Sequence, residues 1–217
     1  MEKITIKELP GVITETLAVA SDGKPIVVFG KDGIGKTGTV IRAIDLLSLR
    51  HNELRALVSE RQDRITATDV VILRSIPMEM ASVDIALAEA FQKVHNKPVI
   101  VTTSADAESI MGPFCERIIA LECKLSFRDW ADWAESSMKW SEGRQVHRID
   151  TRLLSFLREN PQFFCIDRWH SPRAFEQVSR CWEHQSDRKR MLDDLFRETL
   201  GDDEMVKRMN LYLMKYE

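Results

Sequence analysis

Residues Ile26 to Thr37 read I-V-V-F-G-K-D-G-I-G-K-T. The first four, Ile26 to Phe29, form a continuous apolar run, which is typical of a strand buried on both faces of a sheet. From Lys36 to about Arg50, apolar residues recur at helical spacing. The sequence therefore predicts a buried strand, a Gly-rich turn and an amphipathic helix in direct succession.

The turn between this strand and this helix matches the pattern G-x-x-x-x-G-K-[ST] from Gly30 to Thr37. Glycines let the backbone turn sharply and present several N–H groups to a polyphosphate, and the helix adds its positive N-terminal end. We expect Lys36 to reach the β- and γ-phosphates and the Thr37 hydroxyl to be a ligand of Mg²⁺. The expected site for ATP and Mg²⁺ comprises Gly30, Asp32, Gly33, Ile34, Gly35, Lys36, Thr37 and Gly38.

The segments on both sides of this loop alternate between predicted strands and helices. The pattern predicts helices over Ile13 to Ala20 and Ser82 to Val94, and further strands over Leu54 to Ser59, Val70 to Leu73, Pro98 to Thr103 and Arg117 to Leu121. Such alternation indicates an α/β core with a five-stranded, mostly parallel sheet that is covered on both sides.

After Glu122 the pattern turns helical. The predicted helices run over Phe127 to Lys139, Asp150 to Glu159, Pro172 to Gln185, Arg188 to Thr199 and Asp203 to Tyr216. We therefore expect two domains, a P-loop core over residues 1–124 and an all-helical lid over residues 125–217. Trp130 and Trp133 are expected to pack in the core of the lid.

Composition excludes several classes of protein. The 217 residues are 44% hydrophobic and 30% charged, with a net charge of -3, so the basic excess of a dedicated DNA-binding domain is missing. The four cysteines form no Cys-x-x-Cys pair, which argues against a zinc site. Neither a signal peptide nor a membrane-spanning apolar run is visible. We expect a soluble, cytoplasmic protein, with no membrane contact and with nucleic acid an unexpected partner.

Hydrolysis of ATP requires acidic groups that this sequence does not place where they are usual. P-loop ATPases end a neighbouring strand in acids that hold magnesium and polarise water. The best candidate strand here ends at Leu73, and Arg74 and Ser75 follow it. Asp69 lies at the other end of that strand, so Glu79 is the remaining candidate for the catalytic acid. Whether the chain is an ATPase stays open at this point.

Three stretches resemble the AAA+ ATPases, and among them the MoxR-like group of bacteria and their viruses. They are the loop from Gly30 to Thr37, the segment D-W-A-D-W-A from Asp129 to Ala134, and S-P-R-A-F-E from Ser171 to Glu176. In that family, a D-W-x-x-W-A stretch opens the helical lid and a P-R-x-[WF]-E stretch begins the helix carrying the sensor-2 arginine. The resemblance implies a bacterial cell, or one infected by a phage, as the setting.

The resemblance also implies roles for individual residues. Arg173 would contact the phosphates of the nucleotide, and Arg117 would act in trans as an arginine finger in the site of a neighbouring subunit. Thr103 or Ser104 would take the sensor-1 position and orient water. A homo-oligomeric ring or partial ring follows, because an arginine finger works only between subunits. The expected partner is a protein, such as one with a von Willebrand factor A domain.

Three alternatives remain open from the residues. The assembly either hydrolyses ATP with an acid from elsewhere, or binds ATP and turns it over slowly or never. A small P-loop kinase is a second class, with Arg61 to Arg64 as its only candidate lid. A DNA-associated protein of the helicase-loader type is a third, although the sequence offers only the basic run Arg188-Lys189-Arg190, whose plainer interpretation is a solvated helix face.

Overall fold

The chain divides into two compact units, Met1–Lys124 and Leu125–Glu217. The computed structural model describes residues 2–19, 23–54, 68–76, 80–105, 108, 112, 114, 116–136, 138–141, 144–147, 149–164, 171–184 and 203–213.

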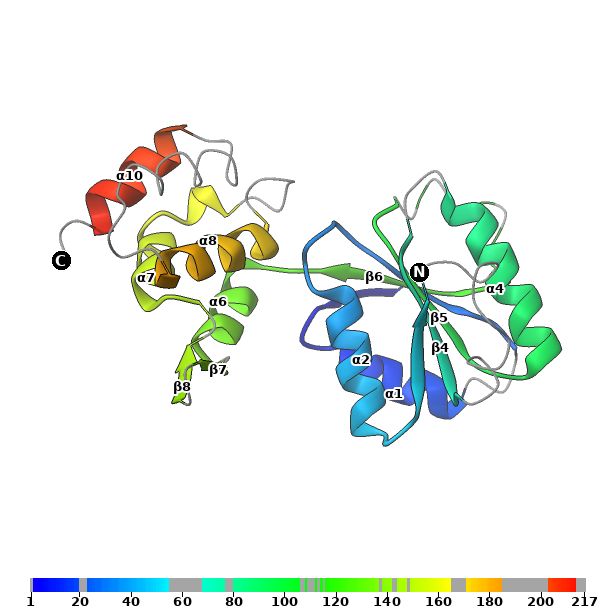
Figure 1. Cartoon of the computed structure of the whole chain (residues 1–217). Helices are drawn as coiled ribbons and strands as arrows, with labels where there is room; N and C mark the ends of the chain where they lie inside the picture. The colour runs from blue at the N-terminus through cyan, green and yellow to red at the C-terminus, as the bar shows by residue number, and fades with distance from the viewer. Residues whose placement is uncertain are drawn as a thin grey trace. The chain divides into compact units, whose positions relative to one another are not determined.

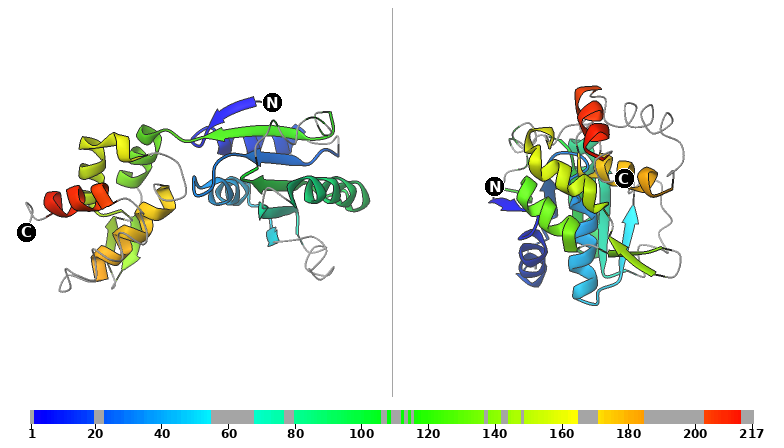
Figure 2. Two further views of the ribbon diagram at one scale, coloured as in Figure 1. Left: turned by 90° about the horizontal axis from the view of Figure 1, so that it is seen from above. Right: turned by 90° about the vertical axis from the view of Figure 1, so that its left-hand side faces the viewer.

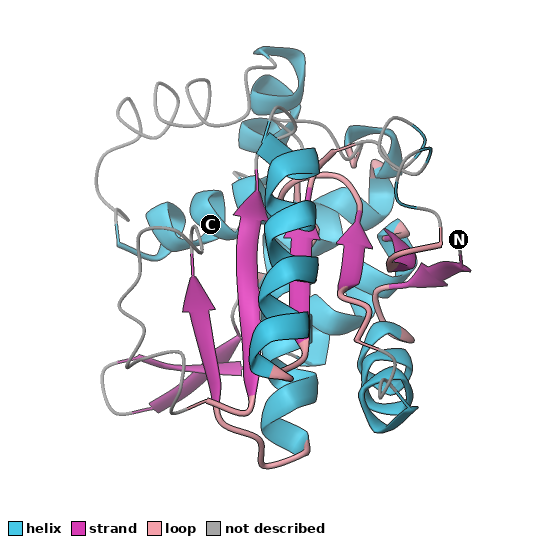
Figure 3. Cartoon of the chain, turned by 90° about the vertical axis from the view of Figure 1, so that its right-hand side faces the viewer, coloured by secondary structure: helices cyan, strands magenta, loops and turns pink. Residues whose placement is uncertain are grey.

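A six-stranded sheet forms the centre of the first unit, and every neighbouring pair of strands is parallel. Its order is β1-β6-β2-β5-β4-β3, so that β2 lies between β6 and β5. Figure 3 shows the central strands of this sheet pointing the same way, with a helix in front of them. The strands are β1 (Glu2–Thr5), β2 (Ile26–Phe29), β3 (His51–Leu54), β4 (Val70–Ile76), β5 (Val99–Thr103) and β6 (Ile119–Lys124).

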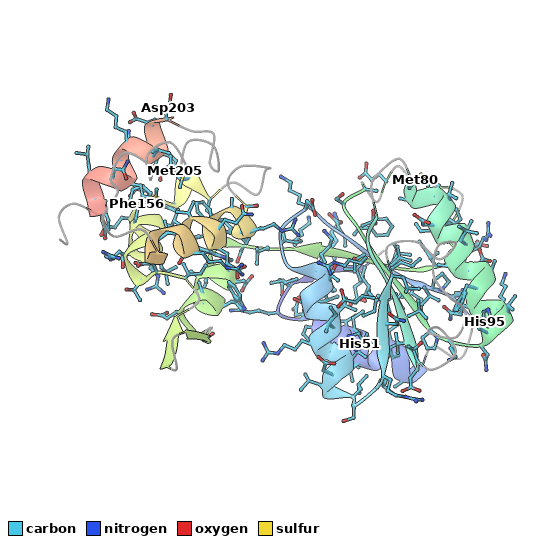
Figure 4. The ribbon with its side chains drawn as sticks, in the orientation of Figure 1. His51, Met80, His95, Phe156, Asp203 and Met205 are labelled. Atoms are coloured by element: carbon cyan, nitrogen blue, oxygen red, sulfur yellow. The ribbon has the colours of Figure 1, made fainter. Side chains whose placement is uncertain are left out.

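Helices cover both faces of this sheet. The helices α1 (Leu9–Val19) and α2 (Lys36–Leu46) pack together on one face, and α4 (Ala81–His95) lies on the other (Figure 1). In Figure 4, Met80 and His95 mark the two ends of α4, and His51 marks the start of β3. This is the covered parallel sheet that the alternation of strands and helices predicts.

The strand pleat assigns alternate side chains to the two faces of the sheet. Val27 and Phe29 of β2 share one buried cluster with Ala81 and Ile85 of α4. Successive side chains in a strand point to opposite faces, so Ile26 and Val28, equally buried, face α1 and α2. The two faces are called the α4 face and the α2 face below.

The second unit is mostly helical. Its elements are α6 (Phe127–Ser136), α7 (Thr151–Glu159), the 3₁₀ turn η2 (Pro161–Phe163), α8 (Pro172–His184), α10 (Asp203–Leu213) and an antiparallel hairpin of β7 (Met138–Ser141) and β8 (Arg144–His147), all visible in Figure 2.

Aromatic rings fill the core of this unit. The Trp130 ring centroid lies 5.0 Å from that of Phe164 and 5.7 Å from that of Phe175. Phe156 and Met205 are buried in the same core, whereas Asp203 at the start of α10 is exposed (Figure 4). The core position expected for Trp130 is confirmed, but Trp133 is 37% exposed, so the same expectation is wrong for it.

The fold class agrees with the prediction, and three details differ. The sheet gains β1 at one edge, which makes six strands and not five. The predicted helix from Phe127 ends at Ser136, and the hairpin follows it, so the second unit is not all-helical. The strand β3 ends at Leu54, where the predicted strand begins.

Several sequence predictions fall outside the described residues. These are the rest of the strand expected to Ser59, the helix expected from Arg188 to Thr199, the lid candidate Arg61 to Arg64 and the acid Glu79. Among the helices of the described part, none combines the length and the apolar character that crossing a membrane requires.

Candidate phosphate-binding site

The Gly-rich loop leaves the sheet where β2 ends and enters α2 at Lys36. Its strand is flanked by β5 on one side and by β6 on the other. In open parallel sheets, ligands bind outside the carboxyl ends of the strands, at the point where connections leave in opposite directions. Here the chain goes from β2 to the edge strand β3, and from β5 across to β6. The loop therefore lies where the topology opens a ligand crevice.

Two glycines allow the loop to take its course. Gly30 has φ +148°, and a Cβ atom there would lie 2.6 Å from the carbonyl oxygen of Cys123 on β6. Gly35 has φ +94° and is the N-cap of α2. Side chains are strained at both dihedrals, and at Gly30 there is also no space for one.

Lys36 is the one lysine in the described residues that is almost fully buried, with 6% of its surface exposed. Its Nζ donates to the carbonyl oxygens of Gly30 and Lys31, at 2.7 Å each. The ammonium group is thereby held under the loop, next to the positive end of α2. A phosphate oxygen approaching the loop meets both the ammonium group and the helix end.

A neutral thiol lies beside this cation. Cys123 is buried, and desolvation raises the pKa of its thiol to about 12, although the nearby Lys36 ammonium acts in the opposite direction. The thiol is therefore protonated at neutral pH. A thiolate therefore does not offset the positive charge of Lys36.

The Thr37 hydroxyl meets a residue that the sequence analysis did not single out. Its Oγ1 lies 2.8 Å from Oγ1 of Thr102 on β5, and Thr102 Oγ1 lies 3.4 Å from the carbonyl oxygen of Leu73 on β4. The sequence feature that could have identified Thr102 is its position in the alternation of side chains along β5. Thr102 pairs with Val28, and so it shares the α2 face with the loop helix.

The two residues expected at the sensor-1 position are oriented differently. Thr103 is fully buried, and its hydroxyl oxygen accepts the N–H of Ala105 at 3.0 Å. By the pleat its side chain is on the α4 face, away from Thr37. Ser104 follows the strand and is exposed. Their catalytic role stays a prediction.

The usual acidic positions hold a cation in this structure. Arg74 follows Leu73 in β4, and its Nη1 donates to Oε2 of Glu53 on β3 at 3.1 Å. The side chain of Ser75 lies outside the described residues, as does Glu79. Asp69, at the amino end of β4, is hydrogen-bonded to Arg50, which lowers the pKa of Asp69 to about 2. Asp69 is therefore paired with Arg50 at the amino ends of the strands, on the opposite side of the sheet from the ends where the loop lies.

Among the residues that the structure describes, the donor set around Thr37 does not fit a magnesium ion held by paired acids. The Thr37 hydroxyl is hydrogen-bonded to the hydroxyl of Thr102. On β4, the residue that follows Leu73 is Arg74, whose side chain is a cation. Within the described residues, no group of three or more His, Cys, Asp or Glu side chains is placed to hold a metal. The ligand role expected of Thr37 stays a prediction.

Arg117 lies near the amino ends of the strands, whereas the loop follows the carboxyl end of β2. It comes two residues before β6, whose first residue Ile119 pairs with Ile26, whereas the loop follows the last residue of β2. Its guanidinium is bonded to Glu89 of α4 and lies over the Phe114 ring, 5.3 Å from the centroid. Arg117 therefore cannot serve the loop of its own chain, and only a role in trans is open to it.

The remaining expected residues are placed as follows. Asp32 and Gly38 are exposed, Gly33 is half-buried with φ +76°, and Ile34 is buried. Arg173 is exposed in the first turn of α8, in the second unit. Its contact with phosphate stays a prediction.

A buried strand, a glycine loop closed over a lysine and a helix beginning at that lysine define the class of P-loop nucleotide-binding folds. No protein-family model matches the sequence, and no curated protein matches it either.

Three solved structures are similar to this chain at low sequence identity. The RuvB Holliday junction branch migration motor of Thermotoga maritima is 12% identical, with 94% of this chain and 67% of that one covered and a TM-score of 0.48. Domain III of the replication initiation protein DnaA of Thermotoga maritima is 13% identical, with 94% and 90% covered and a TM-score of 0.48. PCH-2 of C. elegans is 13% identical, with 94% and 67% covered and a TM-score of 0.43. Likenesses of this size assign no activity to the chain.

Proposed function

We propose that this chain is an AAA+ protein of the MoxR-like kind. It binds ATP, and the bound nucleotide makes it assemble into a ring or partial ring. The assembly remodels or regulates a protein partner, for which a von Willebrand factor A domain protein is the candidate. The observation that supports nucleotide binding is the Lys36 ammonium group, buried under a glycine loop at the start of α2.

Slow or absent hydrolysis is part of the proposal. Arg74 occupies the position where an acid would polarise water, and a guanidinium cannot accept a proton. Each factor of ten in rate corresponds to ~1.4 kcal/mol of barrier. We expect turnover at least two orders of magnitude below the ~10 s⁻¹ typical of enzymes.

Thermal unfolding with and without ATP tests the binding part of this proposal. A ligand that binds only the folded state stabilises it by ~2.7 kcal/mol at 100 times its Kd, and the midpoint rises accordingly. We expect ATP to raise the midpoint of the wild type and to leave that of Lys36→Ala unchanged. An equal rise in the two proteins would place the nucleotide elsewhere.

Phosphate release separates a motor from a switch. If the wild type binds ATP but releases phosphate no faster than Lys36→Ala, the switch form of the proposal is supported. Release at several per second that disappears in Lys36→Ala would show a working ATPase with an acid from another position.

A further inference from the structure

Arg74 lies at the end of β4 that faces the loop, at an irregularity of the strand. Leu73 pairs with Val101 on β5, and the next paired residue is Ile76, which is opposite Thr103. Three steps along β4 therefore match two along β5, so β4 carries one extra residue over Arg74 and Ser75. Such bulges re-aim a side chain at the edge of a sheet.

The side chain of Arg74 is on the same face as the loop helix. Leu54 and Leu73 belong to the buried cluster on the α4 face. Glu53 is consequently on the α2 face. The 3.1 Å contact with Glu53 brings the Arg74 guanidinium to that face as well. Thr37 and Thr102 meet on that face as well.

A short series of contacts connects Arg74 to the loop. The Thr37 hydroxyl contacts that of Thr102 at 2.8 Å, and the Thr102 hydroxyl is 3.4 Å from the Leu73 carbonyl oxygen. This carbonyl belongs to the peptide bond that joins Leu73 to Arg74. The backbone of Arg74 is thus connected to the expected magnesium ligand through two side-chain contacts, while its guanidinium is turned to Glu53 on β3, on the other side of β4 from β5.

We propose that the Arg74 guanidinium takes the place of Mg²⁺ as the second cation on the bound triphosphate, so that the site accepts nucleotide free of metal. This inference rests on the proposed nucleotide binding at Lys36. A guanidinium repels a metal ion, but it binds two phosphate oxygens at once through its planar fork of N–H donors. It therefore supplies the charge that a magnesium ion would supply.

Glu53 holds Arg74 until the nucleotide binds. The Arg74 side chain is 55% exposed, and an ion pair this open to water is weak. A triphosphate offers more negative charge than one carboxylate, so the guanidinium exchanges Glu53 for phosphate oxygens at small cost.

The test is a fluorescence titration of ATP into the wild type and Arg74→Ala, in EDTA and in excess Mg²⁺. We expect the wild type to bind ATP in EDTA at least as tightly as with Mg²⁺. Arg74→Ala should lose affinity in EDTA on the order of 10- to 100-fold, the range for a hydrogen-bonded charge. The inference would be overturned if the wild type bound ATP at least tenfold more tightly with Mg²⁺ than in EDTA. It would also be overturned if Arg74→Ala bound ATP in EDTA with the affinity of the wild type.

Three further variants make the result specific. Arg50→Ala removes a comparable arginine–acid pair at the other end of β4 and should bind like the wild type. Glu53→Gln frees Arg74 and should bind ATP in EDTA equally well or more tightly; weaker binding would count against the exchange. Circular dichroism checks that each variant is folded. If the wild type binds no ATP in either buffer, or if Lys36→Ala binds ATP as tightly as the wild type, the proposed function fails. If binding depends on Lys36 but is the same in Arg74→Ala, only this inference fails.

Discussion

Gly30 lies at a point of the loop with no room for a side chain. A Cβ atom there would lie 2.6 Å from the Cys123 carbonyl oxygen, on a backbone with φ +148°. We expect Gly30→Ala to lower the free energy of unfolding by about 1–3 kcal/mol, because both the clash and the dihedral must be relieved. Urea denaturation without nucleotide measures this.

Gly38 is the matched control in the same segment. Nothing lies within 4 Å of a Cβ atom there, and the residue is inside α2. Gly38→Ala should leave stability unchanged or raise it by about 0.5–1 kcal/mol, because alanine favours the helix. A Gly30→Ala protein as stable as Gly38→Ala would show that the loop does not approach β6 as closely as described.

The chemistry of the loop was predictable from its residues, but its surroundings were not. The pattern from Gly30 to Thr37 indicated where Lys36 and the helix end would lie, since local sequence determines a strand–turn–helix unit. It did not indicate Thr102, because only the register of β5 against β2 brings that hydroxyl to Thr37. A shift of one residue in that register would have presented Thr103 instead.

At the scale of elements, Glu89 attaches α4 to the segment before β6. Its carboxylate is 8% exposed and bonded to Arg117 and to Lys93. The hydrogen bond from Arg117, and next that from Lys93, lower the pKa of Glu89. A folded-state pKa below the unfolded one means that stability is gained above the unfolded pKa and lost as the pH falls through the folded pKa.

Glu89→Gln tests this attachment. We expect a loss of about 1–2 kcal/mol at pH 7, because two cations lose their charged partner. The difference from the wild type should shrink below about pH 4, as the wild-type carboxylate is protonated too. Glu135→Gln, which removes an exposed pair with Arg158 in the other unit, should change little. A Glu89→Gln deficit that persists at low pH would contradict the charge argument.

The elements were predictable where apolar periodicity was long. The helix expected over Ser82 to Val94 is α4 over Ala81–His95. The strand β1 was missed because it is an edge strand of four residues, of which only Ile4 is buried. The hairpin was missed because a helical pattern was continued to Lys139, and because each of its strands has only four residues.

For the molecule as a whole, the proposal predicts assembly that depends on nucleotide. Arg117 lies near the amino ends of the strands, away from the loop of its own chain. It can therefore contact the phosphates only of a nucleotide bound to another chain. Sedimentation velocity should show the 25.0 kDa chain forming larger species when ATP is added. The same distribution with and without ATP would favour the kinase alternative, which needs no neighbour.

The organisation of the whole chain left less trace in the sequence than the loop did. A change of character after Glu122 suggested where one domain ends, and the structure has compact units on either side of Lys124. The partner and the size of an assembly depend on surfaces that no periodicity describes. They follow from contacts between chains, which one sequence does not encode in any local pattern.

Calorimetric titration of ATP into the wild type and into Lys36→Ala tests the central claim most directly. The account predicts a saturable heat with one ATP per wild-type chain, in EDTA as well as in Mg²⁺, and no saturable heat for folded Lys36→Ala. A wild type that gives no heat up to millimolar ATP in either buffer, or a variant that titrates like the wild type, would contradict it.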